Sequence, residues 1–199
     1  MTGFLKRDLY LSIPFFRLYG VFLALALFLT ARSGLLGRTY LLYIMVLGTV
    51  GVQNLFNYDM INAWRSYAAA VPGGRRALVD AHYLTALGLA GAQALTELFI
   101  GWRLGWTGLL HTGFFLLILA LLLPVSCRFG PRQASVAVLL VLGLAVIGAV
   151  AAVAWQDLAL GCDKSRLLAV LGYALPPAGL VLLALSWPLS RRIAAKRDW

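Results

Sequence analysis

Long blocks of apolar residues, separated by short basic patches, run through nearly the whole chain. Each block is close to the about 20 residues that a helix needs to cross the hydrocarbon core of a bilayer. The pattern predicts an all-α membrane protein, a single transmembrane domain over residues 1–199. Its six membrane-spanning helices are expected at Phe15–Ala31, Thr39–Phe56, Tyr83–Trp102, Trp106–Val125, Ala134–Trp155 and Leu167–Trp187.

The first residues follow a different pattern. Leu5, Leu9 and Ile13 recur every four residues, with basic and polar side chains on the other faces. A helix with one apolar face lies in the plane of the membrane surface, and Pro14 would mark a bend before the first span. We therefore expect an amphipathic surface helix over residues 1–14; the alternative is that these residues extend the first span.

Composition excludes an ordinary soluble domain. The chain has 199 residues, of which 62% are hydrophobic and 12% charged, and its mean hydropathy is +0.87. Soluble globular domains carry about 25% charged residues. The net charge of +10 would suit a nucleic-acid partner, but the basic residues fall at the ends of the apolar blocks, as membrane topology requires. We therefore expect no nucleic-acid partner.

The distribution of basic residues predicts the orientation. With six spans, 12 of the 17 Lys and Arg residues fall on the side of the N-terminus and 5 on the other side. Because the cytoplasmic side of a membrane protein carries the excess of Lys and Arg, we expect both termini to be cytoplasmic. The loop 57–82 and the tail 189–199 then lie on the same side.

The loop between the second and third spans is the longest hydrophilic stretch. Asp59 is a possible helix N-cap, and Pro72-Gly73-Gly74 stops the helix that follows it. This short helix carries Trp64 and Tyr67, and large aromatic residues beside an arginine often anchor protein interfaces. Two interpretations are equally open: a docking element for a cytosolic partner, or a helix on the membrane surface with Trp64 among the headgroups.

The loop residues resemble a known family. Leu5-Lys6-Arg7-Asp8-Leu9 is similar to the N-terminal segment of small six-helix permeases of bacterial ABC transporters, in the type-2 exporter group that includes bacteriocin, modulin and antibiotic exporters. The loop matches the same family over about 28 residues, with Val71 in place of a leucine and His82 in place of a lysine. The matching residues are Tyr58-Asp59, Trp64, Tyr67, Val71-Pro72, Arg75, Val79 and Tyr83-Leu84.

The resemblance implies a permease in the bacterial cytoplasmic membrane that exports an amphipathic peptide, an antibiotic or a lipid-like molecule. Its implied partners are ABC ATPase subunits, which bind ATP and Mg²⁺, a second permease chain of the same or another kind, and the lipid bilayer. The loop 57–82 would contain the coupling helix on which the ATPase docks. The docking residues implied are Asp59, Trp64, Tyr67, Pro72 and Arg75.

The chain itself is not expected to be an enzyme. It has no glycine-rich phosphate loop that ends in Gly-Lys-Ser/Thr, so an ATPase has to be supplied by another subunit. His82 and His111 are predicted at opposite membrane surfaces, too far apart to act together. We expect no catalytic residue, no metal site and no bound cofactor in this chain.

Three polar residues inside the predicted spans are candidates for the substrate path. Glu97 is the only carboxylate inside a span, where a charge is costly; it either lines the path or reaches the outer headgroups or Arg103. Gln53 and Asn54 either contact substrate or form hydrogen bonds between helices. The alternative function is a secondary transporter, or a membrane immunity or receptor-like protein, without an ATPase partner.

Overall fold

A computed structural model describes residues 2–32, 34–104, 109–137, 140 and 164–196. Every regular element within those ranges is helical, which confirms the all-α fold. Residues 131–137 form a further helical segment. The helices are α1 (Thr2–Arg32), α2 (Gly34–Ile61), α3 (Trp64–Ala70), α4 (Gly74–Leu104), α5 (Leu110–Phe129) and α7 (Lys164–Lys196).

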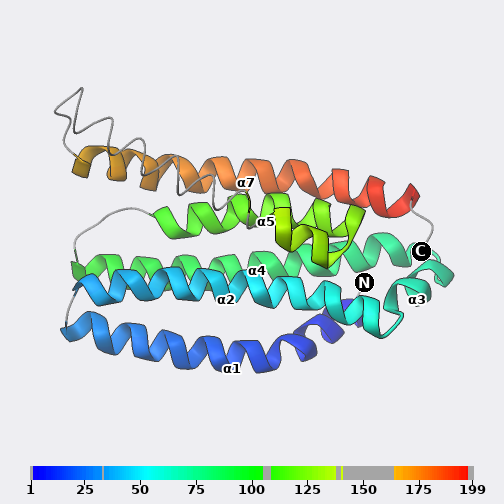
Figure 1. Ribbon diagram of the computed structural model, residues 1–199, viewed down its shortest axis with the longest axis horizontal. Coiled ribbons are helices and arrows are strands. Elements are labelled where there is room, and N and C mark those ends of the chain that lie inside the picture. The colour runs from blue at the N-terminus through cyan, green and yellow to red at the C-terminus, as the bar shows by residue number, and fades with distance from the viewer. Residues whose placement is uncertain (1, 33, 105–108, 138–139, 141–163, 197–199) are drawn as a thin grey trace.

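The long helices lie side by side in an elongated bundle (Figure 1). The helix α1 packs against α2 and α4, and α7 packs along α5. The short helix α3 lies at the same end of the bundle as the N-terminus and the C-terminal end of α7 (Figure 1). We call this the α3 end. The candidate docking site lies at the α3 end, whereas the start of α5 lies toward the opposite end (Figure 1).

Two of the described helices are long and apolar enough to cross a membrane. They are Leu110–Phe129 and Val170–Lys196, with mean hydropathies of 2.1 and 1.6. The number of six spans stays a prediction. Most of the expected fifth span, Ala134–Trp155, lies outside the described residues.

The N-terminal segment is part of a longer helix. The helix α1 continues without interruption from Thr2 to Arg32, with Pro14 inside it, so residues 1–14 do not form a separate helix. Proline lacks the amide hydrogen that would bond to the carbonyl four residues earlier. The first turns of α1 bend away from the axis of the rest, toward α3 (Figure 1), so the expected bend lies within one continuous helix.

Other boundaries also differ from the predicted ones. The helix α2 extends beyond Phe56 to Ile61, so the expectation that Asp59 caps a new helix is wrong. The chain leaves α2 only where Ala63 adopts a left-handed conformation, with φ of 53°. Similarly, α7 continues to Lys196, so most of the expected tail 189–199 is helical.

The α5–α7 contact depends on two glycines. A Cβ atom on Gly113 would lie 2.6 Å from Cβ of Leu175, and one on Gly179 would lie 2.7 Å from Cβ of Leu116. Small residues of this kind let helices approach closely in a membrane. The core beside this seam contains the fully buried Phe115 and Leu119.

Candidate functional site

The helix α3 and the turn after it form the tip of the α3 end. The predicted Pro-Gly stop is confirmed, since α3 ends at Ala70 and α4 begins at Gly74. Gly73 has φ of +70°, a conformation that glycine adopts without steric cost. The side chain of Tyr67 is 56% exposed, whereas Ala68 beside it is 1% exposed. One face of α3 therefore packs on the bundle and the other is open.

The aromatic residues of α3 rest on the first turns of α1. The ring centroids of Trp64 and Tyr67 are 5.4 Å apart, and each is 6.3 Å from that of Phe4. The guanidinium carbon of Arg7 lies 4.9 Å from the centroid of Trp64, within the range of a cation–π interaction. Trp64 thus joins α3 to α1 instead of projecting freely.

Below these rings, four charged residues from three helices form a buried cluster. We call Arg7, Asp8, Asp59 and His82 the ion-pair cluster. His82 Nδ1 is 2.7 Å from Asp8 Oδ2, and His82 Nε2 is 2.7 Å from Asp59 Oδ2. Arg7 pairs with the adjacent Asp8, and its Nη1 lies 2.7 Å from Asp59 Oδ1, an ion pair without hydrogen-bond geometry. The two carboxylates and the imidazole are 0–2% exposed.

The charges of the ion-pair cluster balance. Burial alone would lower the pKa of His82, but the carboxylates of Asp8 and Asp59 outweigh it and raise the pKa to about 9. Burial alone would likewise raise the pKa of Asp8, but His82 and Arg7 hold it below its usual value. Two cations therefore face two anions at neutral pH, in a place that excludes water.

A second polar contact fixes α4 to α7. The carboxylate of Asp80 accepts two hydrogen bonds from Arg191, of 2.6 and 2.7 Å, and one of 2.7 Å from Trp187 Nε1. Arg75, a predicted docking residue, donates to the carbonyl of Ala195 at 3.4 Å. The first turns of α4, directly after α3, are thus attached to α1 and α2 on one side and to α7 on the other.

The predicted docking residues therefore divide into two groups. Tyr67 and Pro72 are exposed at the tip, where a partner can reach them. Asp59 is 1% exposed and points into the ion-pair cluster, while Trp64 and Arg75 are engaged with α1 and α7. For Asp59 and Arg75, these contacts favour a role in fixing the shape of the loop over direct contact with a docked partner.

Glu97 lies far from this site and acts as a helix cap. Its two carboxylate oxygens accept hydrogen bonds from the backbone amides of His111 and Thr112, at 2.9 and 2.8 Å, and from both side chains at 2.8 Å. These amides belong to the first turn of α5, whose free N–H groups favour a negative charge. Glu97 is 4% exposed, and its carboxylate is buried against the first turn of α5; its place in a substrate path stays a prediction.

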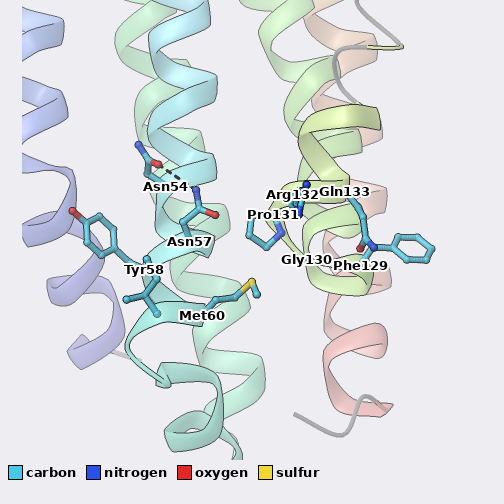
Figure 2. Close-up of a pocket in the computed structure, with 10 residues that line it drawn as sticks. Asn54, Asn57, Tyr58, Met60, Phe129, Gly130, Pro131, Arg132 and Gln133 are labelled. Carbon is cyan, nitrogen blue, oxygen red and sulfur yellow. Dashed lines mark hydrogen bonds between the residues drawn. The ribbon is translucent and has the colours of Figure 1, made fainter.

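A groove of about 700 Å³ opens at the α3 end, between the last turns of α2 and the turn after α5. Its lining combines amides, apolar side chains and one arginine. Figure 2 shows Met60 and Pro131 on opposite walls, with Asn54 and Asn57 joined by a hydrogen bond on the α2 side. The lining residues are Asn54, Asn57, Tyr58, Met60, Ile61, Phe129, Gly130, Pro131, Arg132 and Gln133.

The two polar residues predicted near the end of α2 have different surroundings. Gln53 donates to the Pro131 carbonyl at 3.4 Å and contacts the Ser135 hydroxyl. It therefore connects α2 to the helical segment 131–137, as a packing role requires. Asn54 lines the groove. Of the three candidates for the substrate path, Asn54 is the one that lines this groove.

Sequence reasoning missed the ion-pair cluster. Arg7, Asp8, Asp59 and His82 were all visible as parts of the family resemblance, but their pairing across 23 and 74 positions has no local signal. One hint existed: His82 stands where the similar permeases carry lysine, so a cation at this position faces two carboxylates. Among the described residues, no three or more His, Cys, Asp or Glu side chains are arranged so that they could hold a metal ion.

Comparison with known proteins finds a matching family. The model of the family described as ABC-2 family transporter protein matches residues 3–195 of the chain. No curated protein and no solved structure matches it.

Proposed function

Because the chain belongs to the ABC-2 family of transporter proteins, we propose that it is the membrane-spanning permease subunit of an ATP-driven exporter. A separate ATPase subunit binds ATP and Mg²⁺ and docks on α3. The observation that carries this proposal is the construction of the α3 end, where a short helix with an exposed tyrosine rests on α1 through aromatic contacts, beside buried charges that join α1, α2 and α4.

The contacts of α3 suggest how docking would be transmitted. Trp64 rests on Arg7, Arg7 pairs with Asp59, and Asp59 pairs with His82. A displacement of α3 by the ATPase would therefore move the ends of α1, α2 and α4 together. Such rigid movement of packed elements is a common way to switch between two states of a binding protein.

The orientation follows from charge. Both termini and α3 lie at one end of the bundle (Figure 1), and we place this end in the cytoplasm of a bacterial cell, because it carries most of the basic residues. A soluble ATPase then has direct access to Tyr67 and Pro72. A second permease chain, identical or different, would complete the wall of the path.

The groove at the same end supports an amphipathic cargo. Its walls offer amides and Arg132 beside Met60, Ile61 and Phe129, so a peptide, antibiotic or lipid-like molecule with one polar and one apolar side would find both kinds of contact. Asn54 would then be the first residue of the substrate path.

The secondary transporter is the less supported alternative. Proton-coupled transporters use ionisable groups inside the membrane. Glu97 is the only carboxylate in a predicted span, and both of its oxygens are occupied by the start of α5. A group held in this way serves the structure of the bundle.

The test is co-purification of the tagged chain from its native membrane in mild detergent, with identification of bound subunits and an ATP-hydrolysis assay. Tyr67→Ala should lower recovery of an ATPase that carries a phosphate-binding loop. The expected loss is roughly 30-fold in affinity, the effect of an interface hot spot of about 2 kcal/mol. Trp64→Ala/Tyr67→Ala should abolish stimulation of ATP hydrolysis.

The matched control is Tyr43→Ala. Tyr43 and Tyr67 are both 56% exposed, but Tyr43 lies in the half of α2 that is far from α3. The control variant should keep the ATPase. Equal recovery of the ATPase with all variants would contradict docking on α3. If no ATP-hydrolysing subunit co-purifies with the unmodified chain, the secondary transporter or the immunity protein is favoured.

A further inference from the structure

A second cavity lies at the α3 end, on the opposite side of α4 from the ion-pair cluster. We call it the α7 basic pocket; its volume is about 300 Å³. It is formed by the first turns of α4 and the last turns of α7. The lining residues are Arg76, Pro188, Arg191, Arg192, Ala195 and Lys196.

The pocket carries an excess of positive charge. Arg191 is paired with Asp80, but Arg76, Arg192 and Lys196 are exposed. None of the described residues that line the pocket is acidic. A ligand for this pocket is therefore an anion that can meet three cationic side chains from two helices.

An exposed apolar stripe leads into the pocket along α7. Val181, Leu185 and Leu189 are 59%, 64% and 52% exposed, and they follow one another at intervals of four. Arg192 and Lys196 continue this face at intervals of three and four, the spacing that places residues on one side of a helix. Because α7 is apolar and long enough to cross a membrane, an exposed stripe of this kind suits contact with acyl chains.

We propose that the α7 basic pocket binds the anionic headgroup of a membrane phospholipid, whose acyl chains lie along the stripe. Basic pockets at the cytoplasmic ends of membrane helices attract anionic lipids. A free phosphate ion would use the three cations but not Leu185 and Leu189, whereas a phospholipid uses both. The proposal does not depend on an ATPase partner, because the contacts that carry it lie on α4 and α7.

Native mass spectrometry of the purified full chain tests the proposal. The chain is extracted into mixed micelles that contain phosphatidylglycerol and phosphatidylcholine with identical acyl chains, and the retained lipids are counted. The unmodified chain should retain phosphatidylglycerol over phosphatidylcholine by about tenfold. Arg192→Gln/Lys196→Gln should reduce this preference to about one, since the two lipids then differ little in attraction.

The matched control is Lys6→Gln/Arg128→Gln, which also removes one lysine and one arginine. Both residues are exposed, and both lie outside the pocket. The control should keep the preference; an equal loss in both variants would show general attraction to positive charge and overturn the site. If Arg192→Gln/Lys196→Gln does not fold, Arg76→Gln on α4 replaces it.

Two further results would overturn the proposal. Displacement of the retained phosphatidylglycerol by glycerol phosphate at low concentration would show a site for a free phosphate group. Equal retention of both lipids by the unmodified chain would show that the pocket does not select lipids by headgroup charge. An acidic protein would then be the alternative ligand. Added salt should weaken retention, because the cationic side chains are exposed and screened.

Discussion

Two buried carboxylates, Asp59 and Glu97, are stabilised in different ways. Asp59 faces the cations Arg7 and His82 of two other helices. Glu97 accepts hydrogen bonds from the backbone amides and side chains of the first turn of α5. The two are 1% and 4% exposed, so burial does not distinguish them.

The difference shows what each end of the bundle requires. Glu97 joins two helices, and two of its four donors are amides that cannot lose a proton. Asp59 joins three helices, but each charge in the ion-pair cluster depends on the others, since an unpaired buried charge is costly. The α3 end is therefore held together cooperatively, which suits the proposed movement of this end as one unit.

The largest expected effect follows from Asp59→Asn. The substitution leaves Arg7 and His82 with the single carboxylate of Asp8. Breaking a buried ion pair from one side costs about 3–5 kcal/mol, and we expect a loss of this size. The measurement is thermal unfolding of the purified chain in detergent, with hydrogen exchange in α3 as a local readout.

The control for this variant is Asp80→Asn. Asp80 is also buried, but its partner Arg191 has a side chain that is 46% exposed. Once released, Arg191 is solvated, so the loss should be at most about 1 kcal/mol. Equal destabilisation by the two variants would contradict the cooperative cluster at Asp59.

The pH dependence should be smaller and should depend on residue 82. The pKa of His82 is raised from 6.5 to about 9, so its contribution to stability is complete below about pH 6.5 and is lost as the pH rises through about 9. His82→Lys should keep its charge through this window, because the ordinary pKa of lysine is about 10.4.

The measurement is the unfolding midpoint of both proteins between about pH 7 and about pH 9.5. The unmodified chain should lose about 5 °C more than His82→Lys. If the two curves run parallel, His82 is not the titrating group that holds the α3 end.

The helical fold was predictable because apolar blocks and the Pro72-Gly73-Gly74 stop are local signals. The roles of the two carboxylates were not, and they were nearly reversed: Asp59 was expected to be a helix cap and Glu97 a path or interface residue. A capping rule considers only nearby backbone amides. It does not include Arg7, which α1 brings to Asp59.

The role of Glu97 was likewise not predictable from local sequence signals. The predicted third and fourth spans, Tyr83–Trp102 and Trp106–Val125, follow one another closely in the sequence, but the consequence for Glu97 depends on the point where α5 begins. The described helix α5 starts at Leu110, which places the amides of residues 111 and 112 opposite the carboxylate; the predicted start at Trp106 lies outside the described residues. Gln53 is similar, because its partners at 131 and 135 follow only from tertiary packing.

The smallest expected effect follows from Glu97→Gln. The amide keeps one acceptor oxygen for the start of α5 but loses the charge, so the cost should be about 1 kcal/mol, the usual value of a helix cap. Hydrogen exchange at the amides of His111 and Thr112 should accelerate about fivefold, while exchange in α3 stays unchanged. Thr112→Val, which removes only one of the four hydrogen bonds, should give a smaller acceleration.

ATP-driven transport should continue in Glu97→Gln, since the carboxylate carries no proton in the proposed cycle. Loss of transport with intact ATPase binding would instead make Glu97 a coupling group, and destabilisation as large as that of Asp59→Asn would remove the distinction between the two ends.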